Sequence, residues 1–162
     1  SAAGRGRPEG GRRPSVGLAG VGRLLPAMRA YAAGLTTVRF TGWLAAADLS
    51  ALMERAIALV VPSVVSAGGD REGLPSVAVE AMARGVAVIG SDQSGLADVL
   101  QPCGAGSVVP AADAVALADA MQAMLAPGVR DGMAEAALKV VRETLSPPAQ
   151  SARLEARLLS LL

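Results

Sequence analysis

Short apolar segments rich in valine alternate with longer segments of helical periodicity along most of the chain. Strands are expected at 15–19, 37–41, 58–61, 86–89 and 107–109, and helices at 24–33, 47–58, 74–84, 94–100, 113–125, 130–145 and 149–161. This alternation is typical of parallel strands connected by helices that cover both faces of the sheet. The sequence therefore predicts an α/β fold with a doubly wound, Rossmann-like parallel sheet and helices on both faces.

The side chains available for a core are small. Hydrophobic residues make up 52% of the 162 residues and aromatic residues only 2%, with Tyr31, Phe40 and Trp43 as the complete set. Alanine, valine, leucine and methionine must therefore form the core, and small side chains let helices pack close to a sheet. This length suits one domain, expected over residues 15–162 with a C-terminal helix at 149–161.

The first 14 residues differ in composition from the rest. They hold four arginines against one glutamate, with several glycines and two prolines, while the whole chain has a net charge of +1. A basic segment could contact nucleic acid or anionic lipid, but this composition is more typical of disorder. We expect residues 1–14 to be a disordered Arg/Gly-rich tail and expect no nucleic-acid partner.

Several function classes are excluded by residue content. The sequence has no histidine, which rules out histidine-based zinc sites, Ser-His-Asp triads and Cys-His dyads. Its single cysteine, Cys103, cannot form an internal disulfide, which favours a reducing compartment. No apolar run approaches the roughly 20 residues of a membrane helix, and residues 1–14 lack the apolar segment of a secretory signal. We expect a cytoplasmic protein that is not transmembrane; peripheral contact with the inner face of the membrane stays open.

Ligands of doubly wound sheets bind beyond the carboxyl ends of the strands. The loops at those ends are 20–23, 42–46 and 62–73. Gly20 and Gly22 begin a dinucleotide-binding fingerprint, but Leu25 stands where its third glycine would be, and the next strand ends without an acidic residue. This argues against a nicotinamide cofactor. The two glycines either form a tight turn or allow close approach of a ligand phosphate, and both interpretations stay open.

The third loop and the helix after it carry the most specific pattern. The sequence EGLPSVAVE places Glu72 before the helix and Glu80 more than one turn into it, with Pro75 in the first turn. Main-chain N–H groups around Leu74–Val77 would be unpaired donors where an anion can bind. A sugar near Glu72, a diphosphate at the helix start and a ribose near Glu80 would fit this arrangement.

The charged residues of this segment also have simpler interpretations. Glu80 and Arg84 are four residues apart and could form a surface ion pair worth about 0.3 kcal/mol. Glu72 alone would be an ordinary loop carboxylate. Asp70 and Arg71 would form a solvated pair in the loop.

Residues 15–125 resemble the donor-binding domain of glycosyltransferase family 4 (group 1), which has the two-domain GT-B fold. The resemblance rests on the E-x7-E spacing within EGLPSVAVEAMARGVAVIGSD and on the flanking segments GLAGVGRLLPAMRAYAAGLTTVRFTG, DLSALMERAIALVVPS, SGLADVL and GAGSVVPAADAVALADAM. It implies the C-terminal, nucleotide-sugar-binding half of a retaining hexosyltransferase that acts in polysaccharide or glycoconjugate synthesis. The nucleotide-diphosphate sugar is then the donor substrate, with no cofactor and no metal.

The resemblance also implies roles for the residues at matching positions. Glu72 would be the catalytic residue and would contact the transferred sugar. The substrate-binding residues would be Gly73, Leu74, Pro75 and Ser76 for sugar and diphosphate, Glu80 for the ribose, and Gly42, Trp43 and Leu44 for the nucleobase, with Gly20 and Gly22 added from the first loop.

The family has parts that are not recognisable in this sequence. An amino-terminal acceptor domain, or a separate partner chain in its place, would complete the enzyme. The first strand of the donor domain is also missing, so the strands at 15–19 and 58–61 would either pair directly or leave two unpaired edges, which favours self-association. A non-catalytic remnant, or a module that binds nucleotide sugar without turnover, stays open as an alternative, as does a different doubly wound binding protein.

Overall fold

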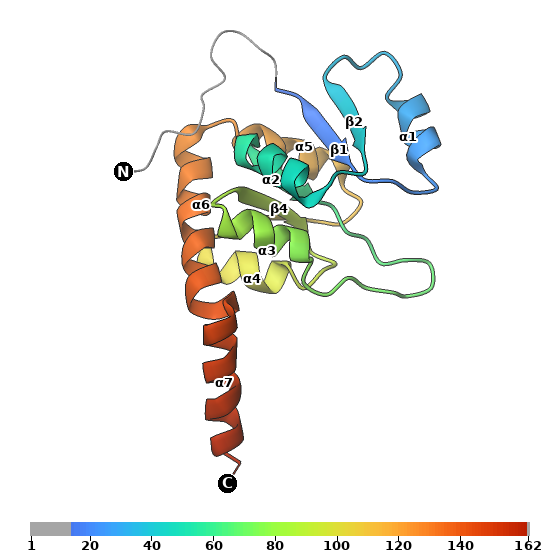
Figure 1. Cartoon of the computed structure of the whole chain (residues 1–162). Helices are drawn as coiled ribbons and strands as arrows, with labels where there is room; N and C mark the ends of the chain where they lie inside the picture. Colours follow the sequence, from blue (N-terminus) through green and yellow to red (C-terminus); the bar gives the residue numbers. More distant parts are fainter. Residues whose placement is uncertain (1–13, 162) are drawn as a thin grey trace. The chain divides into compact units, whose positions relative to one another are not determined.

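The computed structural model describes residues 14–161 and divides the chain into two compact units, with the division between Arg55 and Ala56 (Figure 1). Each unit contains parallel strands connected by helices, which confirms the predicted α/β class. The expected disordered tail falls almost wholly on residues 1–13, outside the described residues. The single domain expected over 15–162 stays a prediction.

The first unit consists of a strand, a helix, a second strand and a second helix. β1 (Val16–Ala19) and β2 (Val38–Gly42) form a two-stranded parallel sheet. α1 (Leu25–Tyr31) connects the two strands, and α2 (Ala46–Arg55) follows β2. These elements agree with the predicted ones to within three residues at each end.

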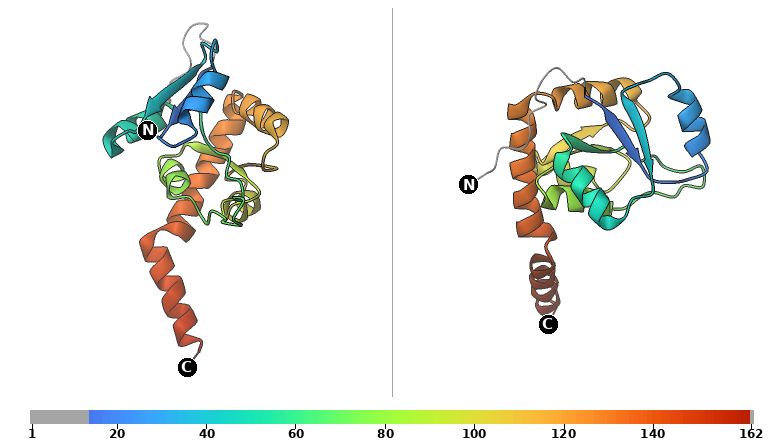
Figure 2. Two further views of the ribbon diagram at one scale, coloured as in Figure 1. Left: turned by 90° about the vertical axis from the view of Figure 1, so that its right-hand side faces the viewer. Right: turned by 45° about the horizontal axis from the view of Figure 1, so that its top comes forward.

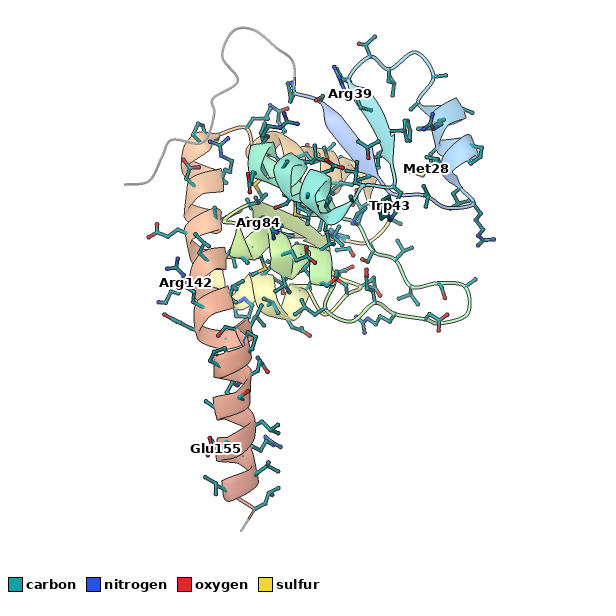
Figure 3. The ribbon with its side chains drawn as sticks, in the orientation of Figure 1. Met28, Arg39, Trp43, Arg84, Arg142 and Glu155 are labelled. Carbon is teal, nitrogen blue, oxygen red and sulfur yellow. The ribbon has the colours of Figure 1, made fainter. Side chains whose placement is uncertain are left out.

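Residues 15–19 were predicted to form a buried strand, and the prediction that this strand is buried is wrong. β1 is present, but three of its four residues are exposed, because two strands and one connecting helix cannot cover both faces of a sheet. Side chains remain open around it: Tyr31 is 91% exposed and Trp43, labelled in Figure 3, is 72% exposed. The guanidinium of Arg29 lies 5.4 Å from the ring centre of Phe40. All three aromatic residues precede residue 56 and therefore belong to this unit.

The second unit is built on a three-stranded parallel sheet in the order β3-β4-β5. The strands are β3 (Ala58–Val61), β4 (Ala87–Ser91) and β5 (Gly106–Val109). β4 lies between its two neighbours, and all five of its residues are buried. In the described part of the chain β1 bonds only to β2 and β3 only to β4, so the two strands do not pair with each other.

Helices cover both faces of this sheet. Ala87 and Ile89 point to the face covered by α5 (Ala114–Ala123), where they pack with Val109 and Met124. The other face has almost no room above it: a Cβ added at Gly90 would lie 2.7 Å from Leu96, and one added at Gly106 2.9 Å from Leu100. Leu96 is the N-cap residue of α4 (Ala97–Cys103), Leu100 lies in the middle of this helix, and both are fully buried.

α3 (Ser76–Ala83) packs close to the sheet through small side chains. Its buried residues are Ala78, Ala81 and Met82. Gly85, expected to end this helix, does so with φ +64, and the N–H groups of Gly85 and Val86 donate to the carbonyls of Met82 and Ala81. These two bonds form a Schellman motif, in which glycine avoids the strain of the left-handed conformation. The predicted cap of α5 is confirmed as well, since the Asp113 carboxylate accepts from two first-turn N–H groups.

Three consecutive helical segments complete the second unit. α6 (Pro127–Val140) continues into the π-helix η1 (Val141–Leu145), and α7 (Pro147–Leu159) follows after Ser146. α6 runs along α3 and α4, whereas α7 extends beyond them in every view and has no buried residue (Figures 1 and 2). No helix among residues 14–161 is both long enough and apolar enough to cross a membrane.

Two glycines of this unit should respond to alanine in opposite directions. Gly132 lies inside α6 with nothing within 4 Å of an added Cβ. We expect Gly132→Ala to raise the free energy of unfolding by about 0.5–1 kcal/mol, because alanine loses less backbone entropy. Gly104, which ends α4 with φ +60 and equally open space, is the matched control. Gly104→Ala should cost roughly 1 kcal/mol; urea unfolding that shows the same sign for both would contradict this account.

Candidate active site

The candidate site of the second unit lies where β3 ends and α3 begins. The connecting segment runs from Pro62 to Pro75, and α3 starts at Ser76 rather than at Leu74 as predicted. The prediction was wrong because Leu74 precedes a proline, which disfavours the helical conformation. Pro75 therefore occupies the N-cap in an extended conformation, with φ −62 and ψ 123, instead of the first turn.

This N-cap leaves main-chain donors at the start of α3. The Pro75 carbonyl accepts from the N–H groups of Ala78 at 3.0 Å and Val79 at 3.4 Å. The N–H groups of Ser76 and Val77 precede these bonds and have no hydrogen-bond partner within the described residues. An anion at this end of the helix would be favoured both by these donors and by the helix dipole.

Glu72 is held in place from two directions. The Ser63 hydroxyl donates to its carboxylate oxygen Oε2. Its main-chain carbonyl and that of Gly73 both accept from the N–H of Gly95, at 3.4 Å and 3.1 Å. Gly95 follows β4, and Ser63 follows β3, so the ends of two neighbouring strands meet around Glu72.

The absence of a side chain at Gly95 makes room for this close approach. A Cβ built there would lie 3.3 Å from the carbonyl carbon of Gly73 and 3.5 Å from the nitrogen of Leu74. Main-chain atoms cannot move aside as easily as a flexible side chain. Gly95 therefore fixes the position of Gly73 and Leu74 before the helix.

Arg71 belongs to the same contact between loops. Its Nε donates to the Gln93 carbonyl at 2.9 Å, and its Nη2 lies 3.5 Å from the Asp92 carbonyl. Asp70 instead bonds with Ser66 through both its main chain and its carboxylate. Asp70 and Arg71 are both exposed, as predicted, but the predicted pairing is wrong, because the bonds of Asp70 go to Ser66 and those of Arg71 to two main-chain carbonyls.

Glu80 lies on the exposed side of α3, one turn after Ser76. Arg84 Nη1 donates to the main-chain carbonyl of Glu80 at 2.8 Å, and this bond does not use the Glu80 carboxylate. The contact between these two residues thus includes a main-chain bond that the four-residue spacing alone did not predict. The carboxylates of Glu72 and Glu80 flank the free N–H groups of Ser76 and Val77 along the chain.

The other predicted binding residues belong to the first unit. Gly20 and Gly42 have φ +131 and φ +70, and the N–H of Gly20 donates to the Gly42 carbonyl at 2.8 Å. Gly20 and Gly22 line an open hollow of about 350 Å³ together with Leu18, Met28 and Phe40. Trp43 is exposed and Leu44 half-buried directly after β2.

Sequence reasoning missed three residues of the site: Ser63, Ser91 and Gly95. The Ser91 hydroxyl donates to the Ser63 carbonyl, and Ser63 in turn bonds to Glu72. A signal was available, because carboxyl ends of adjacent parallel strands meet at one edge, and Ser91 is the last residue of the strand next to β3. The described residues contain no group of three side chains that could hold a metal ion.

The family model for glycosyl transferases group 1 matches residues 11–127, which include the candidate loops of both units. The chain belongs to this family. The predicted resemblance to group 1 glycosyltransferases is thus confirmed, and the Glu72–Glu80 segment lies within the matched residues.

Individual relatives agree with this membership. The chain is 35% identical over 86 residues to a putative colanic acid biosynthesis glycosyltransferase, WcaL, of Escherichia coli K12, covering 53% of this chain and 21% of that protein. It is 39% identical over 99 residues to a phosphatidyl-myo-inositol mannosyltransferase of Mycobacterium leprae, covering 60% of this chain and 25% of that protein. The matched region is thus about a quarter or less of these relatives' length.

A solved structure extends the likeness to the fold. Sucrose-phosphate synthase from Thermosynechococcus elongatus superposes with a TM-score of 0.68 and 28% identity, over 86% of this chain and 35% of that one. The parallel sheets with helices on both faces correspond to one half of a GT-B fold, as the sequence predicted.

Proposed function

We propose that residues 62–80 form the donor side of a retaining glycosyltransferase site, which binds a nucleotide-diphosphate sugar. One observation carries the proposal: along the chain, the unpaired N–H groups at the start of α3 lie between two exposed glutamates, and the first glutamate is held by bonds from Ser63 and Gly95. A diphosphate would bind at Ser76 and Val77, the transferred sugar beside Glu72 and the ribose beside Glu80.

The chemistry of this class suits these residues. Retaining transfer passes through a centre with oxocarbenium character, so an anchored carboxylate and fixed main-chain groups stabilise charge that develops there. Glu72 supplies the carboxylate, and Gly73 to Ser76 supply the main chain. The contacts predicted for Gly42, Trp43 and Leu44 with the nucleobase, and for Gly20 and Gly22 with the donor, concern residues of the first unit and stay predictions.

The names of the relatives suggest a substrate context. One is described as a colanic acid biosynthesis enzyme and another as a mannosyltransferase acting on phosphatidyl-myo-inositol. We propose that the whole protein transfers a hexose in polysaccharide or glycolipid synthesis, with an acceptor domain on the same or a partner chain. The alternative, a module that binds donor without turnover, makes the same binding predictions for this chain.

Calorimetric titration of the chain with UDP-glucose, GDP-mannose and ADP-glucose tests the proposal. We expect one of them to bind, and Glu80→Ala to weaken it by about tenfold or more, since hydrogen bonds to a charged group contribute roughly 1.5–3 kcal/mol. Glu135→Ala, which removes an exposed glutamate from α6, is the matched control and should bind as the unaltered chain does. No binding of any of the three donors would refute the proposal.

A further inference from the structure

A chain of side-chain bonds leads from the buried sheet to the carboxylate of Glu72. Ser91, at the end of β4, is 1% exposed, and its hydroxyl donates to the main-chain carbonyl of Ser63. The hydroxyl of Ser63, which is half-buried, then donates to Oε2 of Glu72. The two serines thus connect the central, fully buried strand of the sheet to an exposed side chain.

The bond from Ser91 holds the main chain of Ser63 and does not use the Ser63 hydroxyl. A hydroxyl has a single proton to donate, and Ser91 uses its proton on the Ser63 carbonyl. That bond fixes the main chain of Ser63 directly after β3. The Ser63 hydroxyl is then free to donate its own proton, and its acceptor in the structure is Glu72.

The bond to Oε2 orients the remaining carboxylate oxygen. A glutamate side chain has three rotatable bonds and is costly to order by itself. With Oε2 occupied by Ser63 and the main chain of Glu72 held by Gly95, little freedom is left. Oε1 has no hydrogen-bond partner within the described residues and can accept from a ligand hydroxyl.

We propose that Ser63 is a positioning residue, which Ser91 fixes from beneath and which aims Glu72 at a hydroxyl of the donor's sugar. The inference rests on the proposed function. Under this proposal the two serines strengthen binding of the sugar portion of a nucleotide-diphosphate sugar and leave binding of the nucleotide portion unchanged. A purely structural role of Ser63 would instead affect both portions alike.

The test compares two affinities for each variant. Calorimetry gives the affinity for whichever of UDP-glucose, GDP-mannose and ADP-glucose binds, and for the matching free nucleoside diphosphate. We expect Ser63→Ala to lower the ratio of the two affinities by about tenfold, with the affinity for the free diphosphate within about twofold of the unaltered chain. Ser63→Thr, which keeps the hydroxyl, should restore the ratio.

Further variants keep each outcome informative. Ser91→Ala should lower the same ratio in the same direction, and it replaces Ser63→Ala in the test if that variant does not fold. Ser66→Ala removes a hydroxyl from the same loop that bonds to Asp70 and not to Glu72, so it should leave the ratio unchanged. Glu72→Ala should lower the ratio at least as far as Ser63→Ala does.

The outcomes separate this inference from the proposed function. If the donor binds and Glu72→Ala lowers the ratio while Ser63→Ala and Ser91→Ala do not, the positioning role is refuted and the proposed function stands. If Ser63→Ala weakens donor and free diphosphate equally, the role is structural and the inference is again refuted. If no donor binds, both fail together.

Discussion

Replacing Gly106 by alanine is expected to lower the free energy of unfolding of the second unit by about 3 kcal/mol. A Cβ at this position would lie 2.4 Å from the main-chain oxygen of Val88 and 2.9 Å from a methyl group of Leu100. The oxygen belongs to the neighbouring strand β4, where Val88 is paired with Gly106, so relief requires the two strands to move apart. Urea unfolding followed by circular dichroism measures the loss.

Two other strand glycines are the controls for this prediction. Gly90→Ala brings its Cβ to 2.7 Å from the side chain of Leu96, which can rotate, so a smaller loss of about 1–2 kcal/mol is expected. Gly17→Ala meets no atom within 4 Å and should change stability by less than about 0.5 kcal/mol. Removing the Leu96 side chain should relieve Gly90→Ala, whereas removing the Leu100 side chain should relieve Gly106→Ala only in part, because the contact with the Val88 oxygen remains. If adding Leu100→Ala fully restored the stability lost in Gly106→Ala, the loss would not come from the contact with the Val88 main-chain oxygen.

Leu100→Ala is expected to cost about 2–5 kcal/mol. Leu100 is fully buried in α4 and lies over the glycines of both β4 and β5, where small residues leave room for it. Neighbouring main chain cannot collapse into the space, because it is already paired in the sheet. The variant therefore combines lost transfer energy with a cavity that stays open.

An exposed leucine in a helix provides the comparison. Leu154 in α7 is 61% exposed, and Leu154→Ala should change the free energy of unfolding by less than about 0.5 kcal/mol. Denaturant midpoints of the two variants give the difference directly. Similar losses for Leu100→Ala and Leu154→Ala would show that α4 does not form a packed core with β4 and β5.

Much of the second unit could be predicted from the sequence because its signals are local. The valine-rich run at 58–61 predicted β3 at its observed bounds, and Asp113 and Gly85 were identified as helix ends from their chemistry. The π-helix at 141–145 has no such signal. Burial of β1 was wrongly predicted because an apolar pattern says what a strand can bury and not whether anything covers it.

The site was predictable as a segment but not as a set of contacts. The E-x7-E spacing located Glu72 and Glu80, and this depends only on positions along the chain. What holds Glu72 comes from residues 9 and 23 positions away, Ser63 and Gly95, and these contacts depend on which strands are neighbours. The hydrogen-bond partners of Arg71 were not predicted for the same reason, since they are main-chain carbonyls 21 and 22 residues away.

Because the three aromatic residues lie in the first unit, the second unit contributes no aromatic fluorescence or near-ultraviolet dichroism, and its unfolding is followed by far-ultraviolet dichroism. Tyr31, Phe40 and Trp43 all precede residue 56, so intrinsic fluorescence and near-ultraviolet dichroism arise from the first unit alone. Loss of structure around Gly106 or Leu100 would leave the Trp43 emission unchanged if the two units unfold separately. The single tryptophan is also useful in binding experiments. A change in its emission when a donor is added would report a change around Trp43. Heat of binding without any change in emission would instead locate binding in the second unit.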